Sequence, residues 1–86
     1  MFKSLWSRSV LDELADIYVS ATSPERDRMA SGIESLIGRL ASDPFDVGES
    51  RDDGDRLAFT PLLMVRFNVN TAACRVLIKA VARYGT

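Results

Sequence analysis

Histidine is absent from this 86-residue chain, and cysteine occurs only once, at Cys74. A disulfide framework within the chain and a Cys/His zinc site are therefore both excluded, and a reducing cytoplasm fits this cysteine usage best. We expect neither a metal nor a cofactor. The opening residues contain acids where a signal peptide needs an apolar run, and no stretch approaches the ~20 apolar residues of a membrane span. The expected protein is soluble, cytoplasmic and without a membrane partner.

Acidic residues are absent from the last 31 positions, since all twelve Asp and Glu lie at or before Asp55. Six Lys and Arg accompany these acids, so the first 55 residues carry a net charge of −6. The remaining stretch has five Lys and Arg and a net charge of +5. A total of −1 therefore combines an acidic half with a basic half, and this asymmetry indicates an anionic partner.

The first half of the chain predicts one short strand and two helices within a single domain, residues 1–86. Residues 2–6 have the composition of an edge strand. Apolar residues then recur at helical spacing over 10–21, behind an N-cap at Ser9. A second helix starts at the sequence Ser23-Pro24-Glu25 and ends near residue 43, ahead of a proline. The short link between these helices predicts an antiparallel hairpin that needs a surface to lie on.

Residues 45–55 have turn chemistry without periodicity and predict a loop. Its acidic cluster, Asp52-Asp53-Gly54-Asp55, has two interpretations. It is either a solvated acidic turn or a segment that folds against the basic strands and masks them. The sequence leaves both open.

The basic half predicts three antiparallel strands, because three runs alternate at period two with only turns between them. The expected register pairs Phe59 with Leu63 across the first turn and Val69 with Cys74 across the second. This register gives one wholly apolar face for the helix hairpin, made of Leu57, Phe59, Leu63, Val65, Phe67, Val69, Cys74, Val76, Ile78 and Ala80. The fold class is therefore α+β, with the hairpin packed on one face of a three- to four-stranded, mostly antiparallel sheet.

The opposite face of this predicted sheet is basic. Its polar members are Arg56, Arg66, Asn68, Arg75, Lys79 and Arg83, and its apolar members are Met64, Leu77 and Val81. Arg56 and Arg66 would lie directly opposite each other, and like charges in that position are destabilising. Such a cluster indicates an anion-binding surface.

The combined pattern resembles the RelE/ParE superfamily of bacterial toxins. The residues that carry this resemblance are the first helix LDELADIY, the loop DPFDVGESR, and the strand pattern RLAF-TPLLMVRFNV-N-RVLIKAVARY. The likeness covers nearly the whole chain. It implies the toxin of a type II toxin–antitoxin system, linked to growth inhibition and plasmid stabilisation. It further implies neutralisation by a cognate antitoxin, within a possible higher-order complex.

The resemblance also implies a set of site residues. Nucleases of this family use Arg and Lys on the sheet and a Tyr near the C-terminus. The matching positions here are Arg56, Arg66, Lys79, Arg83 and Tyr84. Arg51 in the preceding loop and Arg75 complete the expected anion-binding set. Other family members use a His, which this chain lacks. An antitoxin helix is expected to lie on Met64, Leu77 and Val81, or beside the helix hairpin.

Several functions stay open at this stage. Some toxins of the family cleave mRNA on the ribosome, and others inhibit DNA gyrase without enzymatic chemistry. A third interpretation is an inactive, non-catalytic RelE/ParE-like binding module. A fourth is general nucleic-acid binding through the basic face, which would make affinity depend on salt.

Overall fold

A computed structural model describes residues 1–51 and 53–85 of the chain. Its elements follow in the order β1 (Lys3–Trp6), α1 (Arg8–Ser20), α2 (Ser23–Ser42), a 3-10 turn η1 (Pro44–Asp46), β2 (Glu49–Ser50), β3 (Arg56–Thr60), β4 (Leu63–Asn70) and β5 (Arg75–Arg83). No helix in these described parts is both long and apolar enough to cross a membrane.

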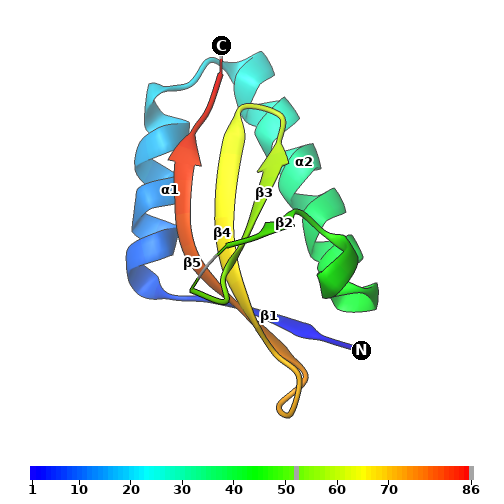
Figure 1. Ribbon diagram of the computed structural model, residues 1–86. Helices are drawn as coiled ribbons and strands as arrows, with labels where there is room; N and C mark the ends of the chain where they lie inside the picture. Colours follow the sequence, from blue (N-terminus) through cyan, green and yellow to red (C-terminus); the bar gives the residue numbers. More distant parts are fainter. Residues whose placement is uncertain (52, 86) are drawn as a thin grey trace.

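The strands in the described residues form one five-stranded sheet in the order β1-β5-β4-β3-β2. β1 pairs with β5 in parallel, and every other neighbouring pair is antiparallel. Figure 1 shows α1 and α2 behind this sheet, with residues 53–55, which lead into β3, in front of it. The expected α+β arrangement is confirmed, and the sheet has one more strand than expected because β2 adds a two-residue edge.

Both helices begin slightly earlier than their sequence signals suggested. Ser7, not Ser9, caps α1, with its Oγ accepting a hydrogen bond of 3.3 Å from the backbone of Val10. Thr22 caps α2 in a reciprocal capping box with Glu25, where each side chain accepts from the other residue's backbone N–H. Such paired caps satisfy two backbone donors that the first helical turn would otherwise leave exposed.

The core lies between the helices and the sheet. Met29, Leu36 and Leu40 of α2 and Val10 of α1 are buried against the inward side chains of the strands. The strand members that are almost wholly buried include Leu63, Val65, Phe67, Val76 and Ile78. The inward set predicted for the middle and final strands is confirmed at these five positions. The alternation of side chains along a strand places their neighbours on the other side.

The predicted register of the first hairpin is wrong by one residue. Thr60 pairs with Leu63, so only Pro61 and Leu62 form the turn, and Leu62 has a φ of 67°. A positive φ is unusual for Leu, and the sequence has no glycine or asparagine here that would have predicted such a turn. A one-residue slip moves every side chain to the other face. Phe59 is therefore exposed on the outer side, and Ala58 is buried in its place.

The second hairpin also differs from its predicted register. A four-residue connection leads from Asn70 to its partner Arg75, and Phe67 then pairs with Ile78. The next pair joins Arg66 to Ala80, so Lys79 is an extra residue in a β-bulge. A bulge shifts the alternation of the strand that contains it. From this point to the end of β5, the side chains that would have pointed outward point inward.

Candidate functional site

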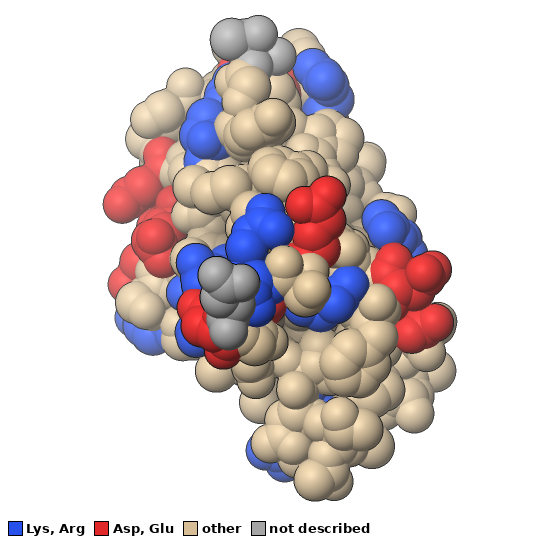
Figure 2. Space-filling model, in the orientation of Figure 1, with Lys and Arg blue, Asp and Glu red and all other residues tan. Residues whose placement is uncertain are grey.

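The candidate site lies on the face of the sheet that the helices leave uncovered, here called the outer face. Its members on β3, β4 and β5 are Leu57, Phe59, Met64, Arg66, Asn68, Arg75, Leu77, Lys79, Ala80 and Ala82. Figure 2 views this face and shows basic and acidic atoms side by side over its middle. The basic surface expected from the sequence is therefore present in part, but it is accompanied by acids.

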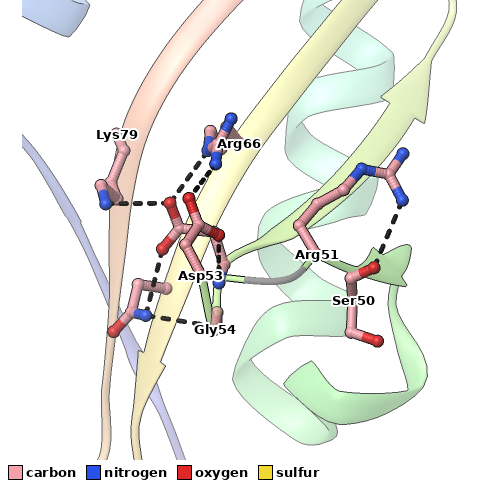
Figure 3. Close-up of polar contacts among 8 residues, drawn as sticks. Ser50, Arg51, Asp53, Gly54, Arg66 and Lys79 are labelled. Atoms are coloured by element: carbon pink, nitrogen blue, oxygen red, sulfur yellow. Dashed lines mark hydrogen bonds and ion pairs between the residues drawn. The ribbon is translucent and has the colours of Figure 1, made fainter.

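Asp55 is the centre of this mixed cluster. Its side chain is 2% exposed and accepts hydrogen bonds from Lys79 Nζ at 2.9 Å, Arg66 Nε at 2.9 Å and Asn68 Nδ2 at 3.2 Å. The guanidinium of Arg66 also contacts the carboxylate of Asp53. Figure 3 shows Arg66 and Lys79 pointing from β4 and β5 toward this acidic segment. Three donors on two strands thus converge on one buried carboxylate.

The donors stabilise the ionised form of Asp55. Hydrogen bonds from Lys79 and then Arg66 lower the pKa of the Asp55 carboxyl from 3.8 to about 2, against the opposing effect of burial. The hydrogen bond to Asp55, together with the nearby charge of Asp53, raises the pKa of the Arg66 guanidinium. Charge-assisted hydrogen bonds of this kind are stronger than neutral ones. The carboxylate of Asp55 and the guanidinium of Arg66 are therefore both ionised at neutral pH.

Two residues of the predicted catalytic set do not lie on the outer face. Arg56 follows the corrected register of β3 inward, where its guanidinium donates to the carbonyl oxygens of Val47 at 2.9 Å and Gly48 at 3.0 Å. Arg83 lies beyond the bulge, pairs with Leu63 and forms an ion pair of 2.5 Å with Glu25 on α2. Their predicted place beside Arg66 is therefore wrong. The short first turn moved Arg56 to the inner face, and the bulge in β5 moved Arg83 there.

The two remaining arginines of the predicted anion-binding set are exposed but lie apart from the cluster. Arg51 contacts Glu49 at 3.4 Å and points away from Arg66, toward Ser50, in Figure 3. Arg75 starts β5 and is paired with Lys3 of β1. Of the expected cations, the structure brings only Arg66 and Lys79 together.

Apolar side chains extend the outer face beyond the cluster. Phe59 and Tyr84 form an aromatic pair with ring centroids 4.7 Å apart, and both rings are about half exposed. Of the predicted partner-binding positions, Leu77 is 45% exposed and Met64 is partly exposed. Val81 is 3% exposed, so its predicted place on this surface is wrong. Because of the bulge at Lys79, the side chain of Val81 points into the core.

The acids of the cluster were not among the predicted site residues. The sequence nevertheless offered a signal, because an acidic turn directly precedes an acid-free basic stretch. Of the two interpretations of that turn, the structure supports folding against the basic strands for Asp53 and Asp55, whereas Asp52 lies outside the described residues. Asn68 was placed on this face without a role, and it now completes the donor set.

Comparison of the chain with known proteins found no matching family model, no similar curated protein and no similar solved structure. Its function is therefore inferred from the geometry of the outer face.

Proposed function

We propose that this protein is the toxin component of a type II toxin–antitoxin module with a RelE/ParE-like fold, and that the outer face is its working surface. One observation carries the proposal. The helix hairpin covers a single face of the sheet, and the opposite face is left open with half-exposed cations, Arg66 and Lys79, beside exposed apolar side chains. Apolar patches with a charged border are typical of protein–protein contact sites.

The geometry favours action by binding over RNA cleavage. Cleavage of RNA through its 2′-hydroxyl needs a base, an acid and cations around the phosphorus. Of the candidates for these roles, Arg56 and Arg83 face away, while Arg66 and Lys79 are already paired with Asp55. Non-enzymatic inhibition of a macromolecular target, such as DNA gyrase or a component of the translation machinery, needs no such catalytic set.

Expression of the chain alone from an inducible promoter tests the proposal. We expect growth to stop, and we expect Leu77→Asp to relieve the arrest by placing a charge within the exposed apolar surface. Leu11→Asp is the matched control, because Leu11 is exposed to almost the same extent, 47% against 45%, but lies on α1. Normal growth in the presence of soluble, folded wild-type protein would overturn the toxin proposal.

A second assay separates the possible targets if growth stops. Intact bulk mRNA together with loss of DNA supercoiling by purified gyrase would identify gyrase as the target. Arrested translation with intact mRNA would identify inhibitory binding to the translation machinery. Rapid mRNA cleavage that is lost in Arg66→Ala and Tyr84→Phe would instead establish the nuclease activity that the geometry disfavours.

A non-catalytic binding module that keeps a partner without toxicity is the second candidate function. The observation that favours it is the pairing of the two central cations with Asp53 and Asp55, which together neutralise the middle of the outer face. We expect the product of an adjacent reading frame to co-purify with this chain. Leu77→Asp should disrupt that complex, and Leu11→Asp should leave it intact. Co-purification without growth arrest would select the binding module over the toxin.

A further inference from the structure

The segment that leads into β3 places two carboxylates over the outer face with different degrees of burial. Asp55 is almost wholly buried, while the side chain of Asp53 is 55% exposed. Both contact Arg66, whose Nε donates to Asp55 and whose terminal nitrogen contacts Asp53. The buried carboxylate of Asp55 therefore orients the side chain of Arg66. The carboxylate of Asp53 contacts the end of the Arg66 guanidinium that faces away from the sheet.

The backbone of this segment holds Asp53 in position. The backbone N–H of Asp55 donates to Asp53 Oδ1 at 3.1 Å, and the N–H of Arg51 donates to the Asp55 carbonyl oxygen at 2.7 Å. Gly54 between them has a φ of 86°, which glycine adopts at little cost. The position of Asp53 over Arg66 is therefore set by a tight local turn, and it is maintained by the buried anchor at Asp55.

The donors beneath this turn have the composition of an oxyanion site. An arginine, a lysine and an amide nitrogen converge on the Asp55 carboxylate, and such charge-assisted donors also bind phosphate oxygens. Arg66 and Lys79 remain 41% and 44% exposed, so solvent still reaches both cations. The acidic segment thus covers the cations only partly, and Asp53 is the more exposed of its two described carboxylates.

Aromatic side chains on the same face indicate which oxyanion fits. Phe59 pairs across the sheet with Met64, which is two residues from Arg66 on the same side of β4. The exposed ring of Phe59 packs against that of Tyr84 at an interplanar angle of 51°. Exposed aromatic rings near cations are the combination that binds single-stranded nucleic acid, because bases stack on the rings and phosphates meet the cations. An acidic peptide would not need the aromatic pair.

We propose that Arg66 and Lys79 form a binding site for a phosphodiester of single-stranded nucleic acid, and that Asp53 is an intramolecular competitor for Arg66. This site deepens the proposed function, since it lies within the same outer face. Asp53 lowers the affinity of the resting protein, and a phosphate that displaces its carboxylate gains the outward nitrogen of Arg66. Asp55 stays in place as a positioning residue for both cations.

Fluorescence anisotropy with a labelled oligothymidylate measures the competition directly on the purified full chain. We expect Asp53→Asn to bind about two- to fivefold more tightly than the wild type, the range that an exposed ion pair supports. The log–log salt slope should become steeper by about 0.7, because one more phosphate contact forms with a single strand. The asparagine keeps the oxygen that accepts from the backbone of Asp55, so the turn is retained.

Asp16→Asn is the matched control, because it removes one negative charge from an exposed position on α1, away from the outer face. It should bind like the wild type. The double variant Asp53→Asn/Arg66→Gln should lose the gain, and Arg66→Met, which also removes the charge, replaces Arg66→Gln if the latter does not fold. Equal affinities of Asp53→Asn and Asp16→Asn, or a gain that persists without Arg66, would overturn the proposal.

A competition arm distinguishes the ligand class. Polyglutamate of equal charge should displace the labelled oligonucleotide poorly from Asp53→Asn, whereas unlabelled oligothymidylate should displace it fully. Stronger displacement by polyglutamate would overturn the phosphodiester assignment. The binding assay is independent of growth inhibition, so a gain in Asp53→Asn without toxicity would retain this site and reject only the toxin proposal.

Discussion

Lys79 Nζ lies 2.9 Å from Asp55 Oδ2, although the two residues are 24 positions apart in the chain. Lys79 is the extra residue of the bulge in β5, and Asp55 directly precedes β3. The contact therefore connects the start of the meander to its last strand across the intervening β4. Because the carboxylate of Asp55 is buried, it fixes the acidic segment in place. Together with Asp53 it balances the charges of Arg66 and Lys79 in the middle of the outer face.

Replacement of Asp55 is expected to destabilise the protein. Asp55→Asn removes the charged acceptor of hydrogen bonds from Arg66 and Lys79, and hydrogen bonds to charged groups contribute about 1.5–3 kcal/mol. We expect the free energy of unfolding in urea to fall by about 2–3 kcal/mol. The control Asp16→Asn should stay within about 0.5 kcal/mol of the wild type. A loss in Asp55→Asn no greater than in this control would contradict the anchoring role of the carboxylate.

Acid should remove the same contribution from the wild type. The pKa of Asp55 is lowered from 3.8 to about 2 in the folded protein, so folding favours its ionised form. The resulting stabilisation is fully present above about pH 4 and is lost as the pH falls through about 2. The difference in Tm between the wild type and Asp55→Asn should therefore shrink over this window.

A second carboxylate contributes to acid sensitivity without affecting that comparison. The backbone N–H of Thr22, followed by the Arg83 side chain, lowers the pKa of Glu25, and this contact is present in both proteins. Its effect cancels in the difference between their Tm values. A Tm difference that is constant from pH 5 to pH 2 would exclude a lowered pKa at Asp55.

The two glycines of α2 should respond to alanine with opposite signs. At Gly32 an added Cβ would lie 2.8 Å from Pro61 Cδ and 3.1 Å from Thr60 Cβ, so the turn after β3 must move. At Gly38 nothing lies within 4 Å. Gly38→Ala should stabilise the protein by about 0.5–1 kcal/mol through helix propensity. Gly32→Ala should be destabilising, and thermal unfolding of the two variants measures the difference. Equal effects of the two substitutions on stability would refute the close approach of α2 to the turn after β3.

Leu77 and Val81 should separate partner binding from core packing. Val81→Ala removes buried methyl groups and is expected to cost about 1–2 kcal/mol of stability. Leu77→Ala alters an exposed side chain and should change stability by no more than about 0.5 kcal/mol. Urea unfolding of the two variants gives the comparison. A larger loss for Leu77→Ala would reverse the assignment of inward and outward positions along β5.

Local signals accounted for much of the fold. The order of strand, two helices and antiparallel meander follows from apolar periodicity and from capping and turn residues, which act over a few positions. The inward positions Val65, Phe67, Val76 and Ile78 were also readable, because alternation along a strand is a property of the backbone. Of the candidate cations, Arg66 and Lys79 were placed on the correct face by the same rule.

The remaining site residues depended on single-residue details of the turns. A two-residue connection at Pro61–Leu62 moved Arg56 inward and Phe59 outward, and no glycine marked the positive φ of Leu62. The bulge at Lys79 moved Val81 and Arg83 inward. Bulges and turn lengths are selected by how well the whole sheet packs on its helices, so periodicity within one strand does not reveal them.

The sequence by itself determined that this chain pairs an acidic half with a basic half, because charge and composition are independent of conformation. It did not determine where the two halves meet. Only the tertiary structure decided that Asp55 is buried among Arg66, Asn68 and Lys79, while Asp53 covers the outward side of Arg66. The reason is that these contacts join residues 11–24 positions apart, and such pairs come together only when the register of the sheet is fixed.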